Sequence, residues 1–374
     1  MRFRIRVIIM LLLTVIALAA GIPCAAESDP ADRLRDAADN IEIPEAAQPY
    51  LTESGLSASD PESLLTISPS EMLQTVLHTA ADEAAAPLRL CGTLLALTVL
   101  TTVLSSLNDA AAHPSMKSLF DAVGTLLCVT AAASPLCTCL IRTADAFQTG
   151  RVFMGSYVPV FAAFIAAGGS VAGGAAYQIF VLFLTETVMQ IAGGILFPLL
   201  QMAAALGIVD AVNPKLHLGC FVSGIHKGVT WLLGFLMALF SALLSVRSFA
   251  ASAADSLAAK SIKLIASSAV PVIGGAVSDA YGTVQGSIRL LRNGVGGIGI
   301  LVILWLVLPP MLSLILYRLV YWLMQFLAET AGASSMAKLY HNMLDILSAA
   351  FALLFCFAVM LIFSSAIMLL LLGN

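Results

Sequence analysis

Charged side chains are scarce in this sequence of 374 residues, of which only 11% are Asp, Glu, Lys or Arg. Soluble globular domains carry roughly 25% charged residues. Here 60% of the residues are hydrophobic and the mean hydropathy is +0.97. Several apolar runs reach the ~20 residues that a membrane-spanning helix needs. The composition therefore excludes a soluble globular protein and predicts an all-α polytopic protein of the cell membrane.

Signatures of catalysis and of metal binding are missing as well. The five histidines show no metal-ligand spacing. The segment GCFVSGIHKG (219–228) resembles the start of a phosphate-binding loop, but Ile225 stands where that loop needs lysine. No basic patch interleaved with aromatic residues indicates nucleic-acid binding. We therefore expect no enzyme activity, no cofactor, no metal and no nucleic-acid partner.

The amino terminus has the pattern of an export signal. Three arginines, Arg2, Arg4 and Arg6, precede the short apolar run Val7–Ala20, and small residues follow. This order of a basic head, an apolar centre and small residues predicts a signal peptide over 1–26. The alternative is an uncleaved first span.

Residues 27–87 differ in charge from everything that follows. They hold thirteen acidic residues against two arginines, net −11, whereas 88–374 holds nine acidic and thirteen basic residues, net +4. Lys and Arg resist export and acidic residues do not, so 27–87 is predicted to be a short exported segment. Ser68, Pro69 and Glu71 form a capping box. It predicts an amphipathic helix on the outer membrane surface or on a partner, or else a solvated lead-in helix.

The multi-span membrane domain is predicted over 88–374, with about seven spans. These are Leu88–Leu107, Leu119–Ile141, Val152–Val171, Tyr177–Val209, Val229–Val246, Val295–Leu316 and Leu347–Leu372. With the amino end outside, they place Arg247–Arg292 in the cytoplasm, as the excess of basic residues there favours. They also leave Arg142 and Arg151 outside, which the same rule disfavours. If Val152–Val171 were a re-entrant hairpin, everything after it would be inverted.

A similar pattern of small residues and proline occurs twice. Val158-Pro159-Val160 lies 112 residues before Val270-Pro271-Val272, and glycine-rich sequence follows both (270 − 158 = 112). This spacing indicates an internal duplication with units 119–210 and 231–322 and with broken or re-entrant Gly/Pro-rich segments, as in transporter-like cores. The alternative is two unrelated glycine-rich segments that allow close helix packing.

Two features are candidates for function within the apolar domain. Glu186 lies near the middle of a predicted span, where charge is costly unless paired or hydrated. It would serve an ion or proton relay, or it would face a partner helix or cavity. Ser267–Asn293 is too rich in glycine and charge for a lipid-facing span. We interpret it as irregular or broken-helix backbone, either re-entrant or cytoplasmic, at a gate; the alternative is a solvated loop.

The segment SAADSLAAKSIKLIASSAVPVIGGAVSDAYGTVQGSIRLLRNGVG (252–296) resembles the most distinctive part of the stage III sporulation protein AE family. The matching residues are Asp255, Lys260, Lys263, Val270, Pro271, Val272, Gly274, Ser278, Asp279 and Asn293. The signal peptide, the acidic lead-in and the order of spans fit this family too. The likeness covers most of the chain after the signal and is weakest in 27–67.

The resemblance implies a membrane component of a secretion-like channel that joins mother cell and forespore, located in the mother-cell membrane around the forespore. It implies an export-gate or permease-like subunit that is required for forespore maintenance and late gene expression. Its partners would be a secretion-type ATPase, small membrane subunits, ring-forming subunits and the lipid bilayer. The alternatives are a non-conducting scaffold for these subunits or a general small-solute transporter. The candidate residues for gating or partner contact are Asp255, Lys260, Lys263, Pro271, Gly274, Asp279 and Glu186.

Overall fold

The computed structural model describes residues 36–38, 41–45, 47–49, 69–110, 114–167, 171–212, 218–242 and 274–371, and these residues form helices without any strand. The helices are α4 (Pro69–Ala110), α5 (Pro114–Ala167), α6 (Val171–Ile191), the π-helix η2 (Ala192–Leu196), α7 (Phe197–Val212), an unlabelled helix (Gly219–Ala242), α9 (Gly274–Thr330) and α10 (Ser334–Leu371). Among the described residues, six helical segments are long and apolar enough to cross a membrane. The predicted all-α, multi-span fold is confirmed.

Helix α5 joins two of the predicted spans, which explains why six segments are found where about seven were expected. Residues 119–141 and 152–171 were predicted to be separate, but α5 continues through 54 residues, past Pro135 and Pro159. The residues that connect the two apolar runs, RTADAFQTGR (142–151), contain no proline or adjacent glycines that would end a helix. At 1.5 Å per residue, α5 is about 81 Å long and exceeds the ~30 Å hydrocarbon core.

Helix α4 likewise joins the predicted amphipathic helix to the first span. It begins at Pro69, the position that the capping box assigns to the first helical turn, and it continues through Pro87 to Ala110. Leu88, where the first span was expected to begin, is therefore the twentieth residue of a continuous helix. The end of the acidic segment is part of the bundle.

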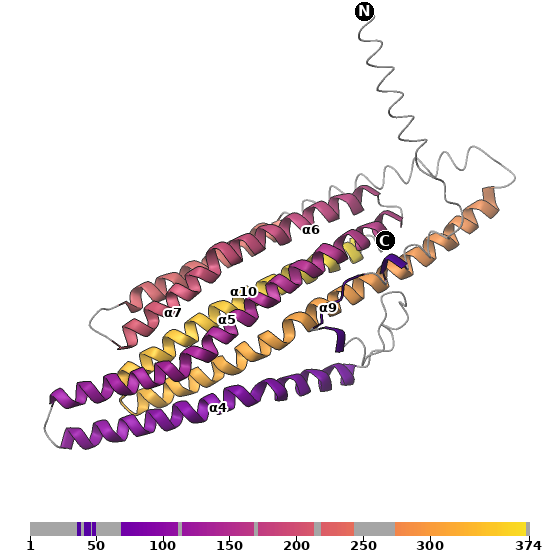
Figure 1. Cartoon of the computed structure of the whole chain (residues 1–374). Helices are drawn as coiled ribbons and strands as arrows, with labels where there is room; N and C mark the ends of the chain where they lie inside the picture. The colour runs from indigo at the N-terminus through magenta and orange to yellow at the C-terminus, as the bar shows by residue number, and fades with distance from the viewer. Residues whose placement is uncertain are drawn as a thin grey trace, which may run out of the picture.

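The direction of α9 differs from the seven-span order. Figure 1 shows α4 and α9 beginning at the same end of the bundle, while α5 and α10 run the opposite way. Residues 101–106 of α4 and 331–336 at the α9–α10 turn line one cavity. The C-terminal ends of α4 and α9 therefore also lie close together. In the seven-span order, the span predicted to begin at residue 295 would start on the opposite side of the membrane from the start of the first span. Because α5 is one helix, the order after it is inverted.

The segment Ser267–Asn293 was interpreted as irregular backbone, and for 274–293 this interpretation is wrong. These residues form the beginning of α9, which is helical from Gly274 to Thr330 and also continues through Pro309 and Pro310. Glycine lowers helix propensity by about 1 kcal/mol without forbidding a helix. Residues 267–273 lie outside the described part of the chain.

A local irregularity does occur in the predicted span 177–209. It is the π-helix η2, in which the Phe197 N–H bonds the Ala192 carbonyl, five residues earlier. Gly193 and Gly194 lie within η2, and Pro198 is the second residue after it. Proline removes a backbone donor and crowds the preceding turn, and a single π-turn accommodates such a defect without ending the helix.

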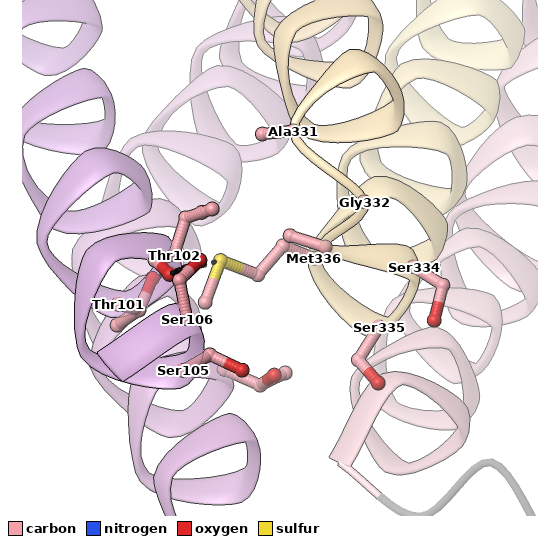
Figure 2. A pocket seen from close by; sticks show the side chains of 11 residues that line it. Thr101, Thr102, Ser105, Ser106, Ala331, Gly332, Ser334, Ser335 and Met336 are labelled. Carbon is pink, nitrogen blue, oxygen red and sulfur yellow. Dashed lines mark hydrogen bonds between the residues drawn. The ribbon is translucent and has the colours of Figure 1, made fainter. Parts of the chain in front are cut away.

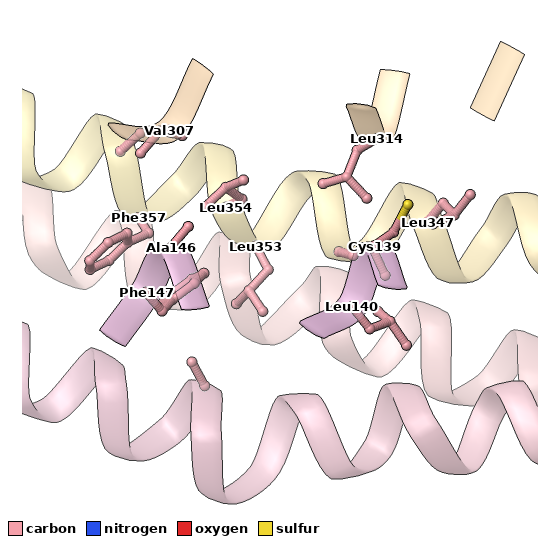
Figure 3. Close-up of a cluster of buried hydrophobic side chains, with 14 of the residues drawn as sticks. Cys139, Leu140, Ala146, Phe147, Val307, Leu314, Leu347, Leu353, Leu354 and Phe357 are labelled. Atoms are coloured by element: carbon pink, nitrogen blue, oxygen red, sulfur yellow. The ribbon is translucent and has the colours of Figure 1, made fainter. Parts of the chain in front are cut away.

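The core lies between α5, α9 and α10 and is filled by apolar side chains (Figure 3). Phe147 of α5 stacks on Phe357 of α10 with ring centroids 4.3 Å apart, and its edge meets Phe197 of α7 at 5.7 Å. Leu353 and Leu354 are also buried in this cluster. Phe147 therefore marks the level at which the most apolar parts of α7, α9 and α10 meet.

Candidate functional site

Most residues predicted for the site lie where side chains are not described. Asp255, Lys260, Lys263 and Pro271 are outside the described residues, and Gly274 and Asp279 belong to the first turns of α9, where the backbone alone is described. Their role in gating or partner contact stays a prediction. Glu186, on α6, is the candidate whose surroundings can be stated.

Glu186 forms an ion pair with Arg151 of α5. The Arg151 Nη2 donates to the two carboxylate oxygens at 2.9 and 2.8 Å. The side chains are 44% exposed for Arg151 and 55% exposed for Glu186. The pair thus connects α5 to α6 at the surface of the bundle rather than in its core.

A second ion pair connects α5 to the helix on its other side. The Arg142 Nη1 donates to Glu83 Oε2 of α4 at 2.7 Å. Arg142 and Arg151 are nine residues apart. At 100° per residue, this spacing places the two side chains on opposite sides of the helix. They therefore mark the two edges of the exposed surface of α5, one beside α4 and one beside α6.

The exposed surface between these pairs carries both polar and apolar side chains. We call it the α5 polar face and define it by the polar side chains that are exposed there or at its two edges: Ser134, Thr138, Arg142, Asp145, Gln148 and Arg151. The apolar Ile141 and Val152 are exposed on the same surface. Residues 134, 138, 141, 145, 148 and 152 recur at three- and four-residue spacing, so they follow one side of the helix.

The depth of the α5 polar face follows from the core. If Phe147 lies at the centre of the apolar layer, Arg142 is about 7.5 Å from this level and Arg151 about 6 Å, at 1.5 Å per residue. Half of a hydrocarbon core is about 15 Å. With Phe147 at that centre, both ion pairs lie level with the most apolar parts of α9 and α10, whereas the sequence-based order had placed both arginines outside the membrane.

One end of the bundle contains a cavity of ≈230 Å³ that is lined largely by hydroxyl groups (Figure 2). Its walls come from α4, α5 and the α9–α10 turn: Thr101, Thr102, Ser105, Ser106, Thr125, Ala331, Gly332, Ala333, Ser334, Ser335 and Met336. Gly332 has φ +76°, a conformation that glycine adopts without strain. None of the lining residues is charged, so the cavity suits water better than an ionic ligand.

Hydrogen bonds next to this cavity fix the helices to one another. Thr98 of α4 and Tyr340 of α10 share a buried hydrogen bond of 2.9 Å, and Tyr321 of α9 donates to the Ala132 carbonyl of α5 at 3.0 Å. Such interhelical bonds contribute about 0.6 kcal/mol on average in a membrane protein. Interhelical hydrogen bonds therefore hold this end of the bundle together.

The fold and the site define a multi-pass helical membrane protein with charged pairs between neighbouring helices at the surface of its spanning bundle. The chain belongs to the stage III sporulation protein AE family, whose model, described as "Stage III sporulation protein AE", matches residues 62–371. The chain is similar to the stage III sporulation protein AE of Bacillus subtilis (strain 168), with 23% identity over 267 residues that cover 71% of this chain and 67% of that protein. No solved structure matches the chain.

The Arg151–Glu186 pair yields a first prediction. Arg151→Gln is expected to lower the stability of the protein by up to about 1 kcal/mol, because it leaves the half-exposed Glu186 carboxylate without its partner. Adding Glu186→Gln removes that charge and is expected to recover most of the loss. The thermal unfolding midpoint of the detergent-purified protein measures both effects. Thr187→Val, next to Glu186, is the control, since its hydroxyl bonds only the backbone of α6. A double variant no more stable than Arg151→Gln would contradict the pairing.

Proposed function

We propose that this chain is the export-gate or permease-like membrane subunit of a secretion-like channel between mother cell and forespore. It would be located in the mother-cell membrane around the forespore and would be needed for forespore maintenance and late gene expression. Membership of a stage III sporulation family supports the sporulation role. The observation that carries the gate role is the pair of charged contacts at the level of the apolar core, since ionisable residues in membrane spans commonly mark ion or substrate pathways.

The gate would act only within an assembly. Its partners would be a secretion-type ATPase, small membrane subunits and ring-forming subunits. The space between α5, α9 and α10 is filled by side chains such as Phe147 and Phe357, so the described bundle has no path through its centre. A conduit would therefore have to run along the outside of the bundle, where other subunits close it.

The same packed core also favours the second candidate function, a non-conducting scaffold that anchors the ATPase and ring subunits. A scaffold needs a rigid bundle with exposed contact surfaces and needs no path. The two functions predict different consequences when a polar candidate residue is removed. Loss of a gate residue should leave the assembly intact, whereas loss of a scaffold contact should release the partners.

The experiment starts from a host strain that lacks the gene. We expect this strain to lose heat-resistant spores and late forespore gene expression, and the wild-type gene to restore both. Asp279→Ala is expected to restore neither, at normal membrane abundance and with the ATPase and ring subunits still co-purifying. Gln285→Ala, on the same helix, is the control and should restore both.

Two results would count against the proposal in different ways. Normal spore yield in the strain without the gene would refute the sporulation channel and leave a general small-solute transporter. If Asp279→Ala instead lost both the co-purifying partner subunits and the spore yield, the result would favour the scaffold.

A further inference from the structure

We propose that the α5 polar face is in contact with water inside the membrane and forms one wall of a path for water and small hydrated cations. The proposal deepens the gate function and rests on it for the biological use of the path. Its physical basis is the depth, the exposure and the chemistry of the residues on this face.

Depth and exposure together make hydrocarbon contact unfavourable. Asp145 and Gln148 are exposed on α5 and lie within two residues of Phe147, so they are about 3 Å or less from its level along the axis. A charged residue at that depth costs about 2.5–3.5 kcal/mol on insertion scales. The described residues do not cover either side chain. Whatever contacts Asp145 and Gln148 is therefore not part of the described bundle.

Snorkelling does not remove this cost. A long Lys or Arg side chain can extend along the helix toward the membrane surface, but Asp145 and Gln148 are too short to cover the ~15 Å to the edge of the hydrocarbon core. Arg142 and Arg151 are long enough to bend away, yet each is held by a glutamate on the neighbouring helix. The polar groups of this face therefore stay at depth.

On α9 and α10 the exposed side chains at the same level are apolar. The side chain of Leu304 on α9 is 37% exposed and that of Phe355 on α10 is 49% exposed, and both lie close in sequence to Leu306 and Phe357, which meet Gly150 of α5. Lipid suits these exposed side chains and does not suit Asp145 and Gln148 of α5. The contrast is between helices of one bundle at one depth, so it reflects the surroundings of each helix rather than the position of the membrane.

The charges on the face favour cations. Arg142 and Arg151 are neutralised by Glu83 and Glu186, and Asp145 adds one further carboxylate, so the group carries a net charge of −1 (two positive, three negative). Fixed charge of one sign along a path concentrates ions of the opposite sign. We therefore expect small cations to enter along this face more readily than anions.

Cysteine accessibility tests the proposal in the full-length protein within its native membranes. In a background whose own cysteines are replaced, Asp145 and Gln148 are changed one at a time to cysteine, with Leu304→Cys and Phe355→Cys as controls at the same level. The probe is a membrane-impermeant, positively charged methanethiosulfonate. Only thiolate reacts, and apolar surroundings raise the thiol pKa by a unit or more, so we expect labelling at least about tenfold faster on the α5 polar face than at the controls.

Each outcome separates this proposal from the proposed function. Equal rates at all four positions, or no labelling on the α5 polar face at normal abundance, would overturn the water path and indicate that lipid or a partner protein covers the face. That result would leave the sporulation role intact. Fast labelling of the face in a protein whose deletion has no effect on spores would support the path and refute the sporulation role. Faster labelling by an anionic than by the cationic reagent would overturn the preference for cations.

Discussion

Gly299→Ala is expected to remove most of the folded protein from the membrane. A Cβ atom at position 299 of α9 would overlap the ring of Tyr157 on α5. Tyr157 is only 1% exposed and stacks between Phe153 and Phe161, with ring centroids 5.3 and 5.4 Å away. The ring therefore has little room to move. Overpacking of a well-filled core costs typically 1–3 kcal/mol and sometimes more, and we expect this substitution near or above the upper end.

The measurement is the abundance of the variant in membranes, together with its thermal unfolding midpoint after purification. Gly155→Ala is the matched control, because a Cβ there meets no atom within 4 Å. It is expected to be neutral or to stabilise α5 by up to about 1 kcal/mol through better helix propensity. Combining Gly299→Ala with Tyr157→Leu should restore part of the loss by removing ring atoms. Equal stability of Gly299→Ala and Gly155→Ala would show that α5 and α9 are not packed this closely.

The existence and approximate position of the helices could be predicted from the sequence because apolar length is a direct requirement of the membrane. Connections between helices were less predictable. RTADAFQTGR (142–151) is polar, and polar residues between two apolar runs usually indicate a loop. In α5 it remains helical because Arg142 and Arg151 find carboxylates on the helices on either side.

The candidate site was predictable only in part for the same reason. Glu186 is conspicuous as a lone acid in an apolar run, whereas Glu83 is one of thirteen acidic residues in 27–87 and has no distinguishing feature there. Its contact with Arg142 links residues 59 positions apart and depends on the antiparallel register of α4 and α5. Sequence analysis could have used an absence as its signal, because no proline and no adjacent glycines interrupt 142–151. Continuing the helix would have inverted the order of the later spans.

Phe357→Ala is expected to have the second large effect on stability. Phe357 is 1% exposed and stacks on Phe147, and a Cβ on Gly150 would lie 2.9 Å from its ring. Removing the ring would leave a cavity between α5 and α10 that the neighbouring helices could not fill without moving. Phe→Ala substitutions in packed cores cost about 3–5 kcal/mol. In a membrane the loss is one of van der Waals contacts rather than of hydrophobic burial, because lipid is itself apolar.

The thermal unfolding midpoint in detergent again measures the effect, and Phe355→Ala is the control. Phe355 is on the same helix two residues away but 49% exposed, so its removal leaves a space that lipid or detergent fills. Phe357→Ala should therefore lower the midpoint far more than Phe355→Ala does. If the two variants behaved alike, the centre between α5 and α10 would not be filled. The path for solutes would then have to be sought through the bundle rather than along the α5 polar face, so this comparison decides where a conduit can run.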